Sequence, residues 1–407
     1  MSATGSQLLA SRVDELLAAR TEANRAFFDA EADALARCCH RMAERFARGG
    51  RLVALGRSPI ARSDVRHVAV EFVHPVIVGK RALPAIGLAA EAGDLPSQVD
   101  VVAEADDIAI AYGADHDPSG ETVEALRRAR ARGCLTIAFA PGDAEWTFEP
   151  PDRDPFIRQE LVETLYHVLW ELVHVFFEHR GLLSGREARP VHDTGASSFL
   201  YPFLSEGERD LEAVIGDVSR SAALKSAEVG ELREQTLTDG RDALLEAAAA
   251  LRSRLDGGGK LLAFGNGGSA TDAMDLVADF RAAPQGWPAR RAIDLTEDPA
   301  IITAIANDIG VEEIFQRQVI AYGRADDAAV ALSTSGNSLN IIEALAEARA
   351  RSILTIAFVG YDGGRVAAEG LADHVIVTRS QHIPRIQEAQ ASAYHVLREL
   401  VELVATA

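Results

Sequence analysis

The sequence has 407 residues, of which 48% are hydrophobic and 25% are charged, and this length and composition predict a globular protein of about two domains. The formal net charge of −20 excludes a broad nucleic-acid-binding surface, which needs clustered positive charge. No apolar run reaches the roughly 18–20 residues that cross a membrane, and three cysteines are too few for a disulfide framework. We therefore expect a cytoplasmic protein without nucleic-acid or membrane partners.

The sequence contains an internal repeat. Gly49–Gly56 matches Gly258–Gly265, and Leu135–Phe139 is identical to Leu354–Phe358. The offset between matched residues grows from 209 (258 − 49) near the start to 228 (395 − 167) near the end. Ordered matches with a drifting offset indicate two homologous halves with loops of different lengths. We expect one domain over residues 1–181, a linker rich in turn-forming residues over 182–205, and a second domain over 206–407.

The predicted elements alternate between strands and helices in both halves. Apolar runs with the length of buried parallel strands cover residues 51–55, 108–111, 135–139, 260–264, 328–332 and 354–359. Helical patterns cover residues 6–47, 121–132, 157–178, 206–234, 339–351 and 385–405. This alternation predicts an α/β fold in which helices cover both faces of a parallel sheet in each half. Ligands of such sheets bind beyond the carboxyl ends of the strands.

A glycine-rich loop, Gly265–Ala270, follows the predicted strand at 260–264. Glycines allow a ligand to approach the backbone closely, and the N-terminus of the next helix offers free N–H groups to an anion. Taken alone, the loop also fits a plain strand-to-helix turn, and its spacing fits a GxGxxA dinucleotide fingerprint.

A serine-rich loop, Ser333–Ser338, follows the predicted strand at 328–332. It carries four hydroxyls and a glycine in six residues, whereas a plain helix N-cap needs one hydroxyl or amide. Such a loop can surround a phosphate monoester with neutral donors. Two phosphate-type loops after two parallel strands favour a phosphorylated small molecule over a nucleotide cofactor.

The motifs Gly265–Ser269, Asp272–Met274, Ala306–Gly310, Ser333–Ser338 and Arg385–Glu388 resemble the sugar isomerase (SIS) family, and more narrowly its phosphoheptose isomerases. Those enzymes interconvert sedoheptulose 7-phosphate and glycero-manno-heptose 7-phosphate. The resemblance covers about residues 244–405 and extends more weakly to about 36–178 through the repeat. It implies two tandem flavodoxin-like SIS domains, each a parallel sheet of about five strands flanked by helices, with a degenerate N-terminal half.

The resemblance also implies roles for single residues. Aldose–ketose isomerisation moves a proton between two carbons through an enediol, which requires a base and a proton partner. Position 279, here Asp279, matches the family's catalytic glutamate, and His395 matches its catalytic histidine. The implied substrate-binding residues are Asn266, Gly267, Gly268, Ser269, Asn307, Asp308, Ser333, Thr334, Ser335, Ser338 and Gln387.

Many members of the family bind zinc through a His-x-x-x-Glu helix together with a later Gln and His. The matching set here is Asp275, Asp279, Gln387 and His395, in which aspartates replace the first two ligands. This set suits zinc, or a harder ion such as Mg²⁺ or Mn²⁺, and the alternative is a solvated helix face at a decayed site. Aspartate is one methylene shorter than glutamate, and a base displaced by about 1 Å can lose about 100-fold in rate.

The first half departs from the family pattern in its phosphate loops, whereas the second half departs from it in the metal-type residues. Proline and acidic residues in its loops, Gly56–Ala61 and Gly113–Gly120, oppose phosphate binding. The metal-type residues nevertheless remain, as His67, Glu71, Gln159 and His167. We hypothesise composite sites, in which the second half holds the phosphate while Glu71 and His167 contribute acid–base or metal chemistry. The alternative is that the first half is a structural pseudo-subunit.

The sequence thus favours a phosphosugar isomerase, with sedoheptulose 7-phosphate as the expected substrate and Zn²⁺ as the expected cofactor. The alternative function is a non-catalytic sugar-phosphate-binding regulator or scaffold. A third interpretation, a dinucleotide-dependent oxidoreductase, is supported by the GxGxxA spacing alone. Since family members commonly form tetramers, a tandem chain is expected to form a homodimer, and so a pseudo-tetramer, that buries the closing helices.

Overall fold

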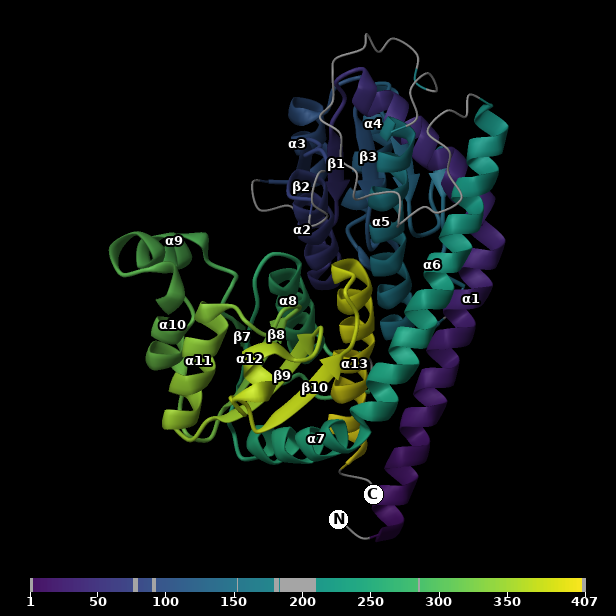
Figure 1. The fold of residues 1–407 in the computed structure, drawn as a ribbon. Coiled ribbons are helices and arrows are strands. Elements are labelled where there is room, and N and C mark those ends of the chain that lie inside the picture. Colours follow the sequence, from purple (N-terminus) through teal and green to yellow (C-terminus); the bar gives the residue numbers. More distant parts are fainter. Residues whose placement is uncertain are drawn as a thin grey trace. The chain divides into compact units, whose positions relative to one another are not determined.

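A computed structural model describes residues 3–75, 80–89, 93–151, 153–178, 183, 210–284 and 286–404 (Figure 1). Apart from Leu183, the expected linker at 182–205 lies outside these residues. The chain forms two compact units. The first-half unit comprises Ala23–Asp154 and Leu161–Ala227, and the second-half unit comprises Met1–Glu22, Pro155–Glu160 and Glu228–Ala407. The short segment Pro155–Glu160 therefore belongs to the unit that is built mainly from the second half.

The first-half unit contains a parallel five-stranded sheet with the order β2-β1-β3-β4-β5. Its strands are β1 (Leu52–Leu55), β2 (Ala85–Leu88), β3 (Ile108–Ala111), β4 (Leu135–Ala138) and β5 (Trp146–Thr147). The intervening elements are α2 (Pro59–Val73), α3 (Leu95–Val102), the 3₁₀ turn η1 (Ala114–His116) and α4 (Glu121–Ala131). Apolar residues of α3 and α4 pack with strand residues in one core cluster, so these two helices cover the same face of the sheet.

The second-half unit contains a parallel five-stranded sheet with the order β10-β9-β8-β6-β7. Its strands are β6 (Leu261–Phe264), β7 (Ala292–Asp294), β8 (Ala328–Ser333), β9 (Leu354–Gly360) and β10 (His374–Thr378). The connecting elements are α7 (Arg241–Asp256), α8 (Gly268–Arg281), α9 (Pro299–Asp308), η2 (Val311–Glu313), α10 (Gln316–Tyr322), α11 (Leu339–Ala350), α12 (Gly364–Ala368) and α13 (Ile383–Leu403).

Helices cover both faces of this second sheet (Figure 1). Residues of α7, α8 and α13 form a hydrophobic cluster with one face, and residues of α10, α11 and α12 form a second cluster with the other face. The remaining long helices are α1 (Ala3–Ala47), α5 (Pro155–Glu178) and α6 (Leu211–Asp239), and each contributes residues to both units. The predicted α/β fold with two parallel five-stranded sheets is confirmed.

Local sequence signals explain where several helices begin. Ser58 caps α2 by accepting a hydrogen bond from the Ala61 N–H, and Pro59 occupies the first turn, where its missing N–H costs nothing. Asp298 and Pro299 start α9 in the same way. Among the described residues, no helix combines the length and apolar character that a membrane span requires.

Candidate functional site

Two aspartates and a histidine meet in the second-half unit. Asp275 and Asp279 lie four residues apart on α8, and His395 lies on α13; all three side chains are buried. The Nε2 of His395 lies 3.2 Å from Oδ2 of Asp275 and 3.4 Å from Oδ2 of Asp279. Tyr394 donates its hydroxyl to the same oxygen of Asp275 at 2.9 Å. The structure thus brings the predicted base and proton partner, Asp279 and His395, within contact distance.

The other ring nitrogen of His395 is held by Glu160, near the start of α5. The Nδ1 of His395 lies 3.0 Å from Oε1 of Glu160. Glu160 also accepts hydrogen bonds from Nε of Arg20 at 2.9 Å and from Oγ of Ser392 at 2.5 Å. All of these side chains are buried, and Arg20 also pairs with Glu399 at 2.8 Å. The histidine is therefore clamped between a carboxylate on each side, and its ring orientation is fixed.

This arrangement sets the protonation of the cluster. Burial opposes the charge on His395, but its hydrogen bonds to Asp275 and Glu160 and the charge of Asp279 outweigh burial and raise its pKa to about 10. Burial, together with repulsion from Asp275, raises the pKa of Asp279 well above its usual range. The cluster therefore favours the imidazolium form of His395, while burial and Asp275 oppose ionisation of Asp279.

The serine loop follows β8 and leads into α11, as predicted. Gly336 has a φ of +61°, and a Cβ there would lie 2.2 Å from the carbonyl oxygen of Gly363, so this position requires glycine. Ser333 Oγ accepts the Gly336 N–H at 3.1 Å, and Ser335 Oγ accepts the Asn337 N–H at 3.2 Å. Each hydroxyl thus stabilises the turn with an oxygen lone pair and keeps its own O–H for another acceptor.

The serine loop borders a cleft of about 670 Å³ in the second-half unit. Its lining residues are Ser335, Asn337, Tyr361, Asp362, Arg379, Ser380 and Gln381. Arg379 follows β10, has a side chain that is 57% exposed, and pairs with Asp239 at 2.9 Å. It places a cation in the cleft beside the neutral donors of the loop, which is a suitable combination for a phosphate.

The glycine loop follows β6, the strand that pairs with β8, so both loops lie at the carboxyl edge of the same sheet. Gly265 must be glycine because a Cβ there would lie 2.2 Å from the Ser269 carbonyl oxygen. Asn266 and Asn340 exchange two side-chain hydrogen bonds, each of 2.9 Å, which tie the glycine loop to α11. The amide of Asn266 is therefore engaged with another side chain in this structure.

The other predicted substrate-binding residues occupy three settings. Gly267 caps α8, and Gly268 and Ser269 open its first turn, where Ser269 is buried. Asn307 and Asp308 are exposed at the end of α9 and hydrogen-bond to each other at 2.7 Å. Gln387 is buried on α13, while Thr334 and Ser338 are half-buried in the serine loop.

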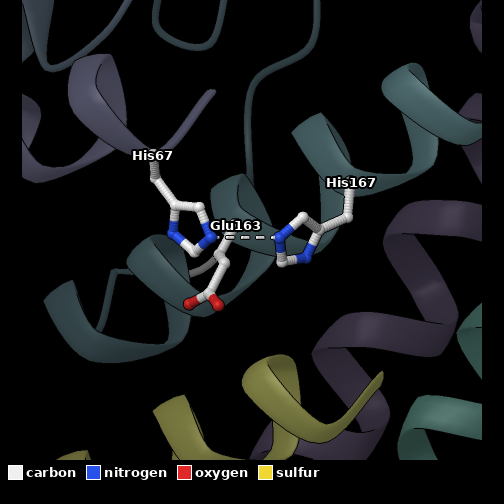
Figure 2. Close-up of side chains that lie close together, drawn as sticks. All are labelled: His67, Glu163 and His167. Carbon is white, nitrogen blue, oxygen red and sulfur yellow. Dashed lines mark hydrogen bonds between the residues drawn. The ribbon is translucent and has the colours of Figure 1, made fainter. Parts of the chain in front are cut away.

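The metal-type residues of the first half form a separate cluster in the first-half unit (Figure 2). His67 on α2 and His167 on α5 face each other with Nε2 atoms 3.3 Å apart. The Nδ1 of His67 lies 2.8 Å from the Tyr166 hydroxyl, and its Nε2 lies 3.9 Å from Oε1 of Glu71. Glu163 lies one turn before His167, and one of its carboxylate oxygens lies within 4.8 Å of a ring nitrogen of each histidine. Burial and the neighbouring His167 hold the pKa of His67 well below its usual range.

The loops of the first half are closed by their own side chains. Asp117 accepts hydrogen bonds from the Thr122 N–H and hydroxyl, both at 2.8 Å, and from the Ser119 N–H at 3.0 Å. Arg57 pairs with Glu121. An acidic side chain thus takes the backbone donors that a phosphate would need, which agrees with the loss of phosphate-type residues in these loops.

Three residues of these sites were missed by sequence reasoning. Glu160 adjoins Gln159 in the repeat of the Arg385–Glu388 motif, but the resemblance implies a role for Gln159 alone. The repeat counterpart of Glu160, Glu388, pairs with Arg385 at 2.6 Å. Glu163 corresponds to Ala391 in the second half, at the offset of 228 that relates His167 to His395 (395 − 167). Arg379 lies outside every motif, and its place beside the serine loop depends on the pairing of β10 with β9.

Comparison with known proteins identifies the family. The sequence model of the SIS domain matches residues 226–360. A phosphoheptose isomerase of Thermodesulfovibrio yellowstonii is 39% identical over 189 residues, which are 46% of this chain and 92% of that protein. One of Aquifex aeolicus is 41% identical over 196 residues, which are 47% of this chain and 96% of that protein.

A solved structure shares the fold of the whole chain. The C-terminal domain of glucosamine-fructose-6-phosphate aminotransferase from Francisella tularensis matches with a TM-score of 0.62 at 9% identity, covering 96% of this chain and 95% of that one. This likeness concerns the fold alone and agrees with a tandem arrangement of two sheets. Together with the identities of about 40% to phosphoheptose isomerases, these findings show that the chain belongs to the SIS domain family, with two tandem SIS-type sheets and a phosphoheptose isomerase-like sequence.

Proposed function

We propose that this protein isomerises a phosphorylated sugar between its ketose and aldose forms through an enediol, and that the sugar is sedoheptulose 7-phosphate. The observation that carries the proposal is the buried contact of 3.4 Å between Asp279 and His395. The relatives at about 40% identity are phosphoheptose isomerases, which supports the same reaction and substrate.

In this proposal the residues divide the work between proton transfer and phosphate binding. Asp279, in its ionised form, removes the proton from the carbon next to the carbonyl, and His395 exchanges a proton with the sugar oxygens. Glu160 and Asp275 position the imidazole ring. The serine loop, with Arg379 beside it, binds the phosphate. Glu71 and His167, the alternative base and proton partner, lie in the other unit.

Zinc is the cofactor we propose for this cluster. Oxygens of Asp275 and Asp279 and a nitrogen of His395 lie within 4.8 Å of one another, and Oδ2 of Asp279 is buried without a hydrogen-bond partner. Two carboxylates and an imidazole fit a divalent cation such as zinc, and His395 would then bind it as a neutral ring, with the metal in place of the proton of the metal-free imidazolium. Gln387 is the further ligand that the family pattern suggests. A bound zinc ion would polarise the sugar carbonyl.

A second candidate function is a non-catalytic sugar-phosphate-binding regulator or scaffold. The raised pKa of Asp279 favours it, because burial and the neighbouring Asp275 oppose the ionised form that a base requires. The clamp on both nitrogens of His395 favours it as well, because an engaged imidazolium needs rearrangement before it can transfer a proton. In this alternative the protein keeps the phosphate cleft and has lost the chemistry.

Turnover separates the two functions. Purified full-length protein is incubated with sedoheptulose 7-phosphate, with added zinc and with a chelator, and conversion is followed by NMR. Conversion that the chelator abolishes supports the isomerase and its zinc. Absence of conversion, with the sugar phosphate still raising the melting temperature, supports the regulator. Absence of both effects contradicts both proposals.

We also propose that two chains form a homodimer. The closing helices α5 and α13 are already buried in the single chain, so the interface would have to use other surfaces. Light scattering after size-exclusion chromatography measures the mass directly.

A further inference from the structure

We propose that the first-half unit contains a metal site of its own, in which His67, His167 and Glu163 hold a divalent first-row cation, with zinc as the expected occupant. This site goes beyond the proposed function and does not depend on it. One nitrogen or oxygen of each side chain lies within 4.8 Å of the others, and all three residues are buried (Figure 2).

The distance between the two histidines fits a shared metal ion. Two imidazole nitrogens at zinc bond lengths of about 2.0–2.1 Å, in tetrahedral geometry, lie about 3.3 Å apart. The Nε2 atoms of His67 and His167 are 3.3 Å apart in the structure. The rings therefore already have the spacing that a common ligand would impose, although they come from different helices.

The surroundings of His67 orient its ring toward the cluster. Its Nδ1 is engaged by the Tyr166 hydroxyl at 2.8 Å, so Nε2 is the nitrogen that faces the cluster. Histidine ligands commonly donate their second ring nitrogen to an outer acceptor, which fixes the ring and its tautomer. With a metal on Nε2, the proton resides on Nδ1 and is donated to the Tyr166 oxygen.

Two glutamates near the histidines supply negative charge for a bound cation. Glu163 and His167 are one helical turn apart on α5, a spacing that puts both side chains on the same face of the helix. Glu71 adds a second buried carboxylate, whose Oε1 lies 3.9 Å from the Nε2 of His67. Two carboxylates and two neutral imidazoles balance the charge of a divalent cation.

The ligand set differs from the one that the repeat predicts. The repeat suggests His67, Glu71, Gln159 and His167, by analogy with the second half. The structure instead places Glu163 beside the two histidines, and its counterpart in the second half is Ala391. This ligand set is therefore specific to the first half, and its metal would link α2 to α5 within that unit.

Metal content of the full-length chain tests the proposal. The background variant Asp275→Asn/Asp279→Asn removes the carboxylates of the other cluster. After chelation, reloading with Zn²⁺ and dialysis, we expect about one zinc per background chain by elemental analysis. Adding His67→Ala or His167→Ala should abolish this zinc, and Glu163→Gln should weaken its affinity by about 10–100-fold. Co²⁺ loaded into the background should give the visible absorption of a tetrahedral site.

The matched control is His174→Asn in the same background. His174 is a buried histidine on the same helix, but it hydrogen-bonds to the carbonyl oxygens of Trp170 and Arg81 at 2.8 and 3.0 Å. We expect this variant to retain its zinc. The proposal is overturned if the background binds neither Zn²⁺ nor Co²⁺, which would leave the histidines as a hydrogen-bonded pair. It is also overturned if the His167→Ala chain keeps its zinc.

The melting temperature provides a second test that does not depend on variants that fold poorly. Zn²⁺ should raise the melting temperature of the background by several degrees, because a ligand that binds only the folded state stabilises it. The conservative variant Tyr166→Phe should bind zinc more weakly while keeping its fold, since it removes only the hydroxyl that engages His67. None of these measurements requires isomerase activity, so a failure of the proposed function leaves this test intact.

Discussion

Glu160 Oε1 accepts a hydrogen bond from Nδ1 of His395 at 3.0 Å, although 235 residues separate the two in the sequence. Glu160 belongs to the sequence of the first half but to the compact unit built around the second sheet. The degenerate half thus contributes a side chain to the acid–base cluster of the other half. This is a composite site of a different kind from the one that the sequence suggests, since the contributed residue is neither Glu71 nor His167.

Replacing Glu160 with Gln should change the pH dependence of turnover. The variant removes a negative charge that helps to raise the pKa of His395, so this pKa should fall, and the limb of the kcat profile that reports it should move to lower pH. We expect kcat to decrease about tenfold or more, with little change in KM, because Glu160 does not touch the phosphate cleft.

The control for this variant is Glu388→Gln. Glu388 is the repeat counterpart of Glu160 and is equally buried, but it pairs with Arg385. Its replacement should leave the pH profile in place. If both variants shift the profile equally, Glu160 has no positioning role for His395.

The length of the side chain at position 279 should limit the rate. Asp279→Asn removes the base and should reduce kcat by about 10²–10⁴-fold. Asp279→Glu restores the residue of the family and moves the carboxylate outward by about one methylene, so we expect kcat to rise, by up to about 100-fold if reach is the sole defect. The measurement is single-turnover and steady-state conversion of the sugar phosphate. A Glu variant that folds normally and is slower than the wild type would contradict this explanation.

The sequence predicts features that depend on neighbouring residues and misses those that depend on distant ones. The six predicted strands, their following loops and the i, i+4 spacing of Asp275 and Asp279 are local patterns, and the structure places them as expected. The remaining strands, β2, β5, β7 and β10, are not among those predicted. The partner of His395 is not local, and the repeat draws attention to Gln159, one residue before Glu160. The counterpart of Glu163 in the second half is Ala391, which cannot bind a metal, so neither the repeat nor the family pattern points to Glu163.

Arg379 should strengthen binding of the phosphate. It lines the same cleft as Ser335, and a charge-assisted contact contributes about 1.5–3 kcal/mol, so Arg379→Gln should raise KM about 10–100-fold with little change in kcat. Ser335→Ala should raise KM to a smaller extent. Isothermal titration with inorganic phosphate measures the same loss without turnover.

Arg365→Gln is the control for the loss of a positive charge. Arg365 pairs with Glu369 at 2.7 Å and does not line the cleft. If its replacement weakens phosphate binding as much as that of Arg379, the effect is due to net charge and not to a contact in the cleft.

The clamp on His395 should make the free energy of unfolding depend on pH. The folded-state pKa of His395 is about 10, whereas that of an unfolded histidine is about 6.5. A raised pKa means that the folded state binds the proton more tightly, so this contribution is fully present below about pH 6.5 and is lost as pH rises through 10. Asp279 acts in the same direction, because its pKa is also raised, and its effect begins at lower pH.

Denaturant unfolding of the wild type and of His395→Gln, measured from pH 6 to pH 10.5, isolates the histidine as the difference between the two curves. We expect the wild type to lose a few kcal/mol more than the variant over this range, on the order given by the pKa difference. Parallel curves would mean that His395 is not held as an imidazolium between Glu160 and Asp275.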